Sequence, residues 1–206
     1  LVQDIQTSYL LNELKDNDVK DFVNDSMVQI KYMSKTLSDF RNFLKPSTKK
    51  NLFSVSKALN EINEIIGKQI FYSNIQMNFN YKNKNEELLI YGYENEFKQV
   101  LLNIINNAKN KIVEKNLPLN KKGSININID KCINYNTIEI IDDAGEIDEK
   151  IINSIFEPYF TTKEDGMGLG LYMAKIIIED KMRGIINVRN DENRVIFTIK
   201  LPHKKA

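Results

Sequence analysis

The sequence predicts an α+β protein in which a helical hairpin is followed by a two-layer α/β sandwich. Three observations lead to this prediction. A heptad-like series of apolar residues runs through Val19–Leu44, as in a long amphipathic helix. Lys45-Pro46-Ser47 then ends the pattern, because proline cannot continue the hydrogen-bond ladder of a helix. Beyond this point, apolar residues at a spacing of two alternate with apolar residues at helical spacing, which indicates a mixture of strands and helices.

Residues 1–47 are predicted to be two helices that form part of a four-helix bundle. Leu1–Leu14 carries its apolar residues along one face, and Asp16-Asn17-Asp18 supplies an N-cap for the second helix. That helix would be about 42 Å long at 1.5 Å per residue, longer than a small domain is wide. It either packs on the chain's own core or buries its seam against a second copy, and its length favours the second copy. We therefore expect a homodimer through Val19–Leu44 and a domain boundary after Ser47.

Residues 48–206 are predicted to form the sandwich. Strands are expected at Leu52–Val55, Ile75–Tyr81, Glu87–Tyr93, Ser124–Lys131, Thr137–Ile141, Ile185–Arg189 and Arg194–Leu201. Helices are expected at Ser56–Ser73, Glu94–Lys115, Asp148–Phe156 and Gly168–Lys181. Ser124–Lys131 with Thr137–Ile141, and Ile185–Arg189 with Arg194–Leu201, are spaced as hairpins. Most strand pairing should therefore be antiparallel.

Composition excludes several classes of function. The 206 residues contain 29 Lys and Arg against 28 Asp and Glu, so the net charge of +1 creates no field that favours nucleic acid or an anionic membrane. Cys132 is the single cysteine, which excludes a disulfide framework and a cysteine metal site. It lies in a strand-like run and is interpreted as an inert side chain. No signal peptide is visible, and no apolar run reaches the roughly 18 residues of a membrane span. A cytoplasmic location is expected.

The predicted helix Glu94–Lys115 is the first of three segments that carry chemistry. It holds asparagine at 103, 106, 107 and 110, although asparagine is a poor helix former because its amide competes with the backbone. Together these residues cost about 2–3 kcal/mol relative to alanine. They either reflect the chain's general richness in asparagine or supply amide oxygens to a hard ion such as Mg²⁺ beside phosphates.

Asp142 and Gly145 form the second segment, directly after a predicted core strand. A buried carboxylate is costly unless it is hydrogen-bonded. An adenine amino group would be a suitable donor, and glycine would let the backbone approach the base closely. An ordinary Asp-Gly turn is the alternative.

The third segment is Gly166-Met167-Gly168-Leu169-Gly170-Leu171, which precedes an apolar helix. Glycines in this place let backbone N–H groups face an anion. The segment does not follow a strand, so it fails the test for a dinucleotide-binding motif. The stretch before it, Asp148–Asp165, suits a lid that closes over a ligand.

In this order the segments resemble the motifs of the kinase core of bacterial sensor histidine kinases, in the GHKL ATPase superfamily. The matching segments are the N box at Leu102–Ala108, the first glycine box at Asp142–Ile147, the F box at Phe156–Lys163 and the second glycine box at Gly166–Leu171. Thr36–Pro46 also resembles the end of the dimerisation helix in one branch of these kinases. The resemblance covers essentially the whole chain, and four boxes in order are highly specific.

The resemblance implies an ATP site and transfer of the γ-phosphoryl group to a histidine, for relay to the receiver domain of a response regulator. By position, Asn107 would ligate Mg²⁺, Asn103 would support the phosphate side, and Asp142 would accept from adenine above Gly145. The other implied ATP-binding residues are the phosphate-loop glycines Gly166, Gly168 and Gly170, the lid anchors Leu169 and Leu171, and Lys163 as a phosphate contact. The resemblance is compatible with a whole protein that is anchored in a membrane.

Two departures from the family pattern matter. Glu146 stands where the first glycine box usually has glycine, which would stiffen the lid hinge or add an acidic group there. The only histidine, His203, follows the last predicted strand and is interpreted as a solvated tail residue. Because the chain starts at Leu1 in an already helical pattern, we expect it to be part of a longer protein whose acceptor histidine lies upstream. Autophosphorylation of this piece alone is therefore not expected.

Two other functions remain as alternatives. A GHKL ATPase of the chaperone or topoisomerase type needs a general base, which that family places where this chain has Asn103. An amide cannot accept a proton from water, which disfavours hydrolysis as the main reaction. The other alternative is a non-catalytic module that binds ATP or dimerises.

Overall fold

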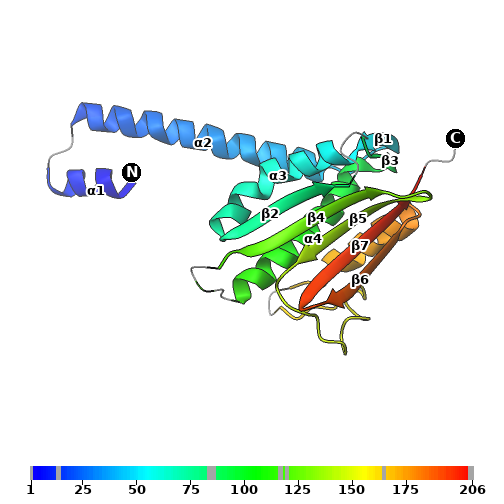
Figure 1. Ribbon diagram of the computed structural model, residues 1–206. Helices are drawn as coiled ribbons and strands as arrows, with labels where there is room; N and C mark the ends of the chain where they lie inside the picture. The colour runs from blue at the N-terminus through cyan, green and yellow to red at the C-terminus, as the bar shows by residue number, and fades with distance from the viewer. Residues whose placement is uncertain are drawn as a thin grey trace. The chain divides into compact units, whose positions relative to one another are not determined.

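The computed structural model describes residues 2–12, 15–82, 87–115, 118, 121–163 and 166–203. The chain divides into two compact units, Leu1–Lys45 and Pro46–Ala206 (Figure 1). The division falls within the Lys45-Pro46-Ser47 segment that interrupts the helical pattern of the sequence. In the described part of the chain, no helix combines the length and the apolar character needed to cross a membrane.

The N-terminal unit consists of helices α1 (Val2–Leu10) and α2 (Asp16–Leu44). The first helix is shorter than predicted. It gives way to a turn in which Asn12 has a φ of 53°, a left-handed conformation that ends helices. The expected positions Leu1 and Leu14 lie outside the described residues.

The second helix begins three residues earlier than the first apolar residue of its seam. The Asp18 carboxylate accepts a hydrogen bond from the backbone N–H of Lys15 at 3.0 Å, a contact that fixes the entry of the chain into the helix. The first seam residues are solvent-exposed within the chain, namely Val19 at 41%, Val23 at 51%, Met27 at 47% and Ile30 at 57%. The later seam residues Met33, Leu37, Phe40 and Leu44 lie outside the described side chains.

The C-terminal unit contains a mixed sheet of five strands in the order β2-β4-β5-β7-β6. These strands are β2 (Ile75–Tyr81), β4 (Gly123–Lys131), β5 (Tyr135–Asp142), β6 (Ile185–Asp191) and β7 (Arg194–Pro202). Strands β2 and β4 are parallel and the other pairs are antiparallel. A separate antiparallel pair is formed by β1 (Asn51–Ser54) and β3 (Leu89–Gly92). The predicted α+β sandwich is confirmed.

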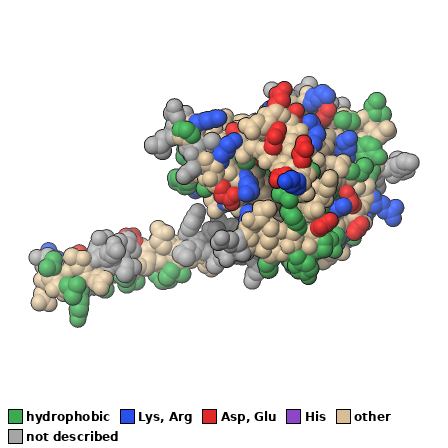
Figure 2. Space-filling model, turned by 90° about the horizontal axis from the view of Figure 1, so that it is seen from below, with side chains coloured by type: hydrophobic (Ala, Val, Ile, Leu, Met, Phe, Trp, Pro, Cys, Tyr) green, Lys and Arg blue, Asp and Glu red, His purple; other side chains and the backbone are tan. Residues whose placement is uncertain are grey.

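Helices cover one face of this sheet (Figure 1). They are α3 (Val55–Tyr72), α4 (Glu94–Glu114) and α5 (Gly170–Lys175), which continues as the π-helix η1 (Ile176–Lys181). The core between the layers is apolar, with Leu59, Phe97, Leu101, Ile127 and Ile140 fully buried. Burying a side chain of this size contributes roughly 1.5–3 kcal/mol. The opposite face of the sheet carries mostly polar side chains, such as Asn78, Asn126 and Glu139, at the alternate strand positions. Acidic and basic side chains are interspersed on the side of the larger unit that Figure 2 shows.

Two predicted helices differ from the structure. The segment Asp148–Phe156 is a run of turns, because bonds such as Ser154 N to Ile151 O at 2.8 Å join residues three apart and do not build an α-helical ladder. The predicted helix Gly168–Lys181 starts at Gly170 and widens into a π-helix at Ile176. This widening is accompanied by burial of the adjacent residues Ile177 and Ile178.

Two single-residue interpretations also need correction. Cys132 lies just beyond β4 and is exposed, so it is not a strand residue. His203 is partly buried, and among the described residues its Nε2 atom is buried without a hydrogen-bond partner. The prediction of a solvated tail was therefore wrong, because the backbone N–H of His203 follows β7 and bonds to Asn134 O at 3.5 Å.

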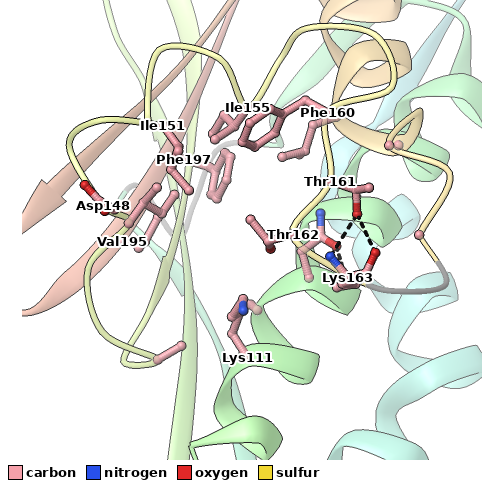
Figure 3. Close-up of a pocket in the computed structure, with 18 of the residues that line it drawn as sticks. Lys111, Asp148, Ile151, Ile155, Phe160, Thr161, Thr162, Lys163, Val195 and Phe197 are labelled. Carbon is pink, nitrogen blue, oxygen red and sulfur yellow. Dashed lines mark hydrogen bonds between the residues drawn. The ribbon is translucent and has the colours of Figure 1, made fainter.

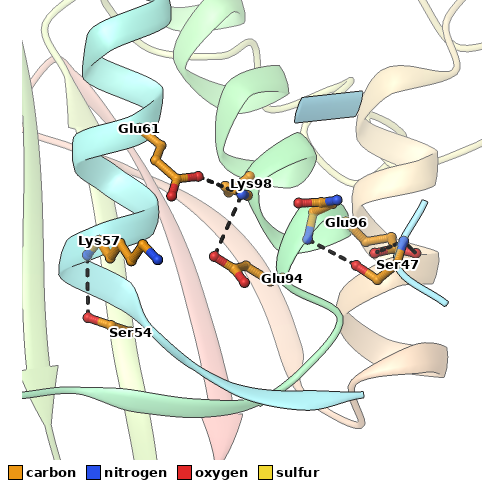
Figure 4. A network of polar contacts seen from close by, with 8 residues as sticks. Ser47, Ser54, Lys57, Glu61, Glu94, Glu96 and Lys98 are labelled. Carbon is orange, nitrogen blue, oxygen red and sulfur yellow. Dashed lines mark hydrogen bonds and ion pairs between the residues drawn. The ribbon is translucent and has the colours of Figure 1, made fainter. Parts of the chain in front are cut away.

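A polar network holds the start of α4 in place (Figure 4). The ammonium of Lys98, 6% exposed, lies 2.7 Å from the Glu61 carboxylate on α3 and 3.6 Å from that of Glu94. In the same first turn of α4, the Glu96 carboxylate accepts from the N–H of Ser47 at 3.3 Å, and Ser47 Oγ accepts from the N–H of Asn95 at 3.2 Å. These contacts fix the helix whose next turns carry the asparagines.

Candidate functional site

A cavity of about 540 Å³ opens beside α4, the end of β5 and the segment that links β5 to α5. All the predicted site residues except Asn103 line it, namely Asn107, Asp142, Gly145, Lys163, Gly166, Gly168, Leu169, Gly170 and Leu171. Asn103 lies beside it, where its Nδ2 donates to the carbonyl oxygen of Gly170 at 3.2 Å. Segments that are far apart in the sequence therefore meet at one cavity.

Helix α4 presents one amide and one amine to this space. The Asn107 Oδ1 atom accepts from the Lys163 Nζ atom at 3.2 Å, so the amide oxygen predicted to meet a metal ion already faces a cation. Lys111 lies one turn further along the same face and also lines the cavity (Figure 3). Lys111 was not among the predicted site residues, although its spacing of four from Asn107 places both side chains on one face of the helix.

Asp142 ends β5 and is 4% exposed. Burial raises the pKa of its carboxyl from the ordinary 3.8 to about 6; neighbouring Asp143 adds to the rise, while the N–H of Ala144 and the ammonium of Lys115 oppose it. The N–H of Ala144 donates to Oδ1 at 3.1 Å, and within the described part of the chain Oδ2 receives no hydrogen bond. The carboxylate thus keeps an acceptor for a donor in the cavity.

Asp143 has a different place. Its carboxylate accepts from the N–H and the hydroxyl of Ser124 at 2.9 and 3.2 Å. It therefore ties the end of β5 to the start of β4 and does not line the cavity. The two adjacent aspartates are separated by the alternation of side chains in a strand.

Glycine is required at two places around the cavity. Gly145 has a φ of 98° and Gly168 a φ of 65°, conformations that favour a residue without a Cβ. A Cβ at Gly168 would also lie 2.6 Å from the carbonyl oxygen of Tyr159. Gly168 thus lets the second glycine box pass directly against the F-box segment, which closes that side of the cavity.

Apolar side chains form the opposite wall, facing Lys111 and Lys163 (Figure 3). They are Ile151, Ile155, Phe160, Val195 and Phe197. Phe197 makes an edge-to-face contact with Phe156 at 6.4 Å between ring centroids. This wall was not predicted, because an apolar residue that lines a cavity has the same spacing in the sequence as one that is buried in the core. An apolar wall with a few polar groups suits a base and its phosphates.

Residues 92–205 match the family described as histidine kinase-, DNA gyrase B-, and HSP90-like ATPase. The chain belongs to this family. Its C-terminal unit is the catalytic ATP-binding domain of histidine kinases, which confirms the resemblance drawn from the four boxes. ATP use follows from membership of this domain family.

Two bacterial kinases are similar in sequence to this chain. Sporulation kinase A of Bacillus subtilis is 30% identical over 171 residues, which are 82% of this chain and 27% of that kinase. Sporulation kinase C of the same organism is 26% identical over 189 residues, 91% of this chain and 42% of that kinase. The chain therefore spans less than half the length of these curated relatives.

Solved structures show the same ATPase fold. The nucleotide-free catalytic domain of histidine kinase ThkA is 29% identical with a TM-score of 0.64, covering 75% of this chain and 96% of that domain. A complex of ThkA with the response regulator protein TrrA matches 98% of this chain and 57% of that chain, at 23% identity and a TM-score of 0.62. At 23% identity, the match to the ThkA complex shows a shared fold and nothing further.

The donor set suits a metal that is shared with phosphates. Among the described residues, no three His, Cys, Asp or Glu side chains are grouped closely enough to hold a metal ion. The Asn107 amide oxygen is a hard neutral ligand, and Mg²⁺ is often bound by one or two protein oxygens together with phosphate oxygens. The residues present therefore fit Mg²⁺ only as part of a Mg-nucleotide complex.

Proposed function

We propose that this chain is the ATP-binding catalytic core of a two-component sensor histidine kinase. It would transfer the γ-phosphoryl group of ATP to a histidine beyond the printed sequence, for relay to a response-regulator receiver domain. The observation that carries the proposal is the meeting of Asn107, Asp142 and the second glycine box at one cavity. His203 is not a suitable acceptor, because it lies far from the cavity along the sheet. It follows Pro202, which pairs with Tyr135 at one end of β5, whereas Asp142 is at the other end of that strand.

Each cavity residue has a role in this proposal. Asp142 accepts from the adenine amino group, and Gly145 lies beneath the ring. The backbone of Gly166, Gly168 and Gly170 faces the phosphates, with Leu169 and Leu171 anchoring the lid and Asn103 supporting this end through its bond to Gly170.

Lys163 and Asn107 act at the phosphate end. Asn107 would hold Mg²⁺, which when bound neutralises charge on the triphosphate. Lys163 would exchange its contact with Asn107 for one with a phosphate. Both residues orient the γ-phosphoryl group, which is most of what a phosphoryl-transfer enzyme does.

The rest of the proposal concerns partners and location. The exposed seam of Val19, Val23, Met27 and Ile30 supports a homodimer through Val19–Leu44. The complex of ThkA with TrrA is consistent with a response regulator as the second partner. Use of ATP supports a cytoplasmic location for this core, within a whole protein that is compatible with a membrane anchor.

Phosphoryl transfer and hydrolysis can be separated directly. The chain is incubated with γ-labelled ATP and a separate protein that carries the acceptor helix of the whole kinase. Acid-labile phosphohistidine on the acceptor is expected. Steady phosphate release without labelled histidine would instead support the GHKL ATPase, and tight ATP binding with neither product would support a non-catalytic module.

A further inference from the structure

Asn190 makes a two-point contact with the backbone of Ile147. The N–H of Ile147 donates to Asn190 Oδ1 at 3.0 Å, and Asn190 Nδ2 donates to the carbonyl oxygen of Ile147 at 2.7 Å. Both bonds are partly buried. One side-chain amide thus satisfies the donor and the acceptor of one residue, which fixes the orientation as well as the position of the backbone.

The contact between Asn190 and Ile147 makes the loop Ala144–Asp148 an arch, which crosses the end of strand β7 from β5 to β6. Asp142 on β5 and Asn190 on β6 are both paired with Val195 on the intervening strand β7. The loop Ala144–Asp148 leaves β5 after Asp142, and it is tied at Ile147 to Asn190, on the far side of β7. Every residue of this loop lines the cavity, as does Val195. Asn190 itself does not line it.

A second bond strengthens the same arch. The Glu146 carboxylate accepts from the N–H of Asn193, in the β6–β7 turn, at 3.3 Å. Glu146 is the residue that departs from the family's glycine. Its contact with Asn193 supports the stiffened hinge, and as a residue of the cavity wall it also places an acidic group there. Gly145 lies between these hydrogen-bonded residues. On one side Ala144 donates to Asp142, and on the other Glu146 and Ile147 are bonded to Asn193 and Asn190.

We propose that Asn190 is a positioning residue for nucleotide binding, which acts by holding the loop Ala144–Asp148 in its arched form over Val195. This rests on the proposed ATP site. A loop with a glycine in the left-handed region has many accessible conformations, and ordering it on binding lowers affinity. By ordering the loop beforehand, Asn190 lets Gly145 and Asp142 meet the base without that loss.

The test uses Asn190→Asp and a matched control. The aspartate keeps an oxygen for the N–H of Ile147 but places a second oxygen against the carbonyl oxygen of Ile147. Asn187→Asp introduces the same charge on the same strand, at an exposed position whose side chain points to the other face of the sheet. Asn190→Ser, which adds no charge, is measured alongside in case Asn190→Asp does not fold.

Calorimetry with ADP and amide hydrogen exchange at Ile147 give the answer together. Relative to Asn187→Asp, the Asn190 variants are expected to exchange the Ile147 amide faster and to bind ADP roughly 10-fold more weakly, about 1.4 kcal/mol. The binding stoichiometry stays that of the wild type, whereas a partly unfolded sample would lose binding sites. Affinity within twofold of the control, with faster exchange at Ile147, would overturn the role. Absence of ADP binding by the wild type would refute the proposed function itself, and this inference with it.

Discussion

Nucleotide affinity should depend on the protonation of Asp142. Burial raises the pKa of this carboxyl to about 6, and only the carboxylate form offers both oxygens as acceptors to an adenine amino group. At pH 5 about nine-tenths of the molecules would carry the protonated form, against about one in a hundred at pH 8. Since apparent affinity scales with the competent fraction, binding should be roughly 10-fold weaker at pH 5 than at pH 8.

The assay is a calorimetric titration with ADP across this pH range. Ionisation of the ADP phosphates also changes with pH, so each affinity is divided by that of Asp142→Asn, which binds the same ligand without a titrating group at this position. The ratio is expected to rise with pH and to level off above the pKa of Asp142. A ratio that stays constant from pH 5 to pH 8 would refute the assignment of Asp142 to the base.

Other expectations concern the metal, the stability of the fold and the dimer. Asn107→Ala should abolish the gain in ATP affinity on adding Mg²⁺ and should stop phosphoryl transfer, and unchanged Mg²⁺ dependence in calorimetry would remove Asn107 from the metal site. Asp142→Asn should stabilise the fold at pH 8 by up to about 3 kcal/mol, because burial raises the pKa of Asp142 from 3.8 to about 6. The penalty on the charged form grows as the pH rises from 3.8 to about 6, so the gain in denaturant midpoint should be complete above this window and vanish below it. Lys98→Met should lower the free energy of unfolding by about 1–3 kcal/mol, since it leaves Glu61 and Glu94 without their shared cation. Lys82→Met removes an ion pair whose lysine side chain is 73% exposed, so it should leave the free energy of unfolding nearly unchanged. Met27→Glu should shift light scattering from dimer to monomer, and a dimer that survives would move the interface away from the α2 seam.

The residues that carry motifs were predictable from the sequence, and the surfaces around them were not. The positions of Asp142 and the glycines follow from local rules, since a polar residue that ends an apolar strand and glycines before a helix are visible in the chain itself. Strand alternation also predicted the bounds of β4, β5 and β7 to within two residues at each end. The parallel pairing of β2 with β4 was not predicted, because register between distant strands is set by the whole sheet.

The errors have identifiable physical causes. The turns of Asp148–Phe156 place Ile151 and Ile155 at the cavity, and in sequence those residues have the spacing of an amphipathic helix. The π-helix at Ile176–Lys181 was not predicted, because π-helices are rare and nothing in the apolar pattern of this segment distinguishes one from an α-helix. Asn190 was invisible for a similar reason: in a chain rich in asparagine, only the fold shows which amide meets the backbone of Ile147.

The most direct test of the central claim is a crystal structure with a non-hydrolysable ATP analogue and Mg²⁺. We expect the purine amino group within hydrogen-bond distance of the Asp142 carboxylate, and the triphosphate between Asn107 and Gly166–Gly170. A nucleotide bound elsewhere on the chain, with Lys163 still on Asn107, would contradict the account.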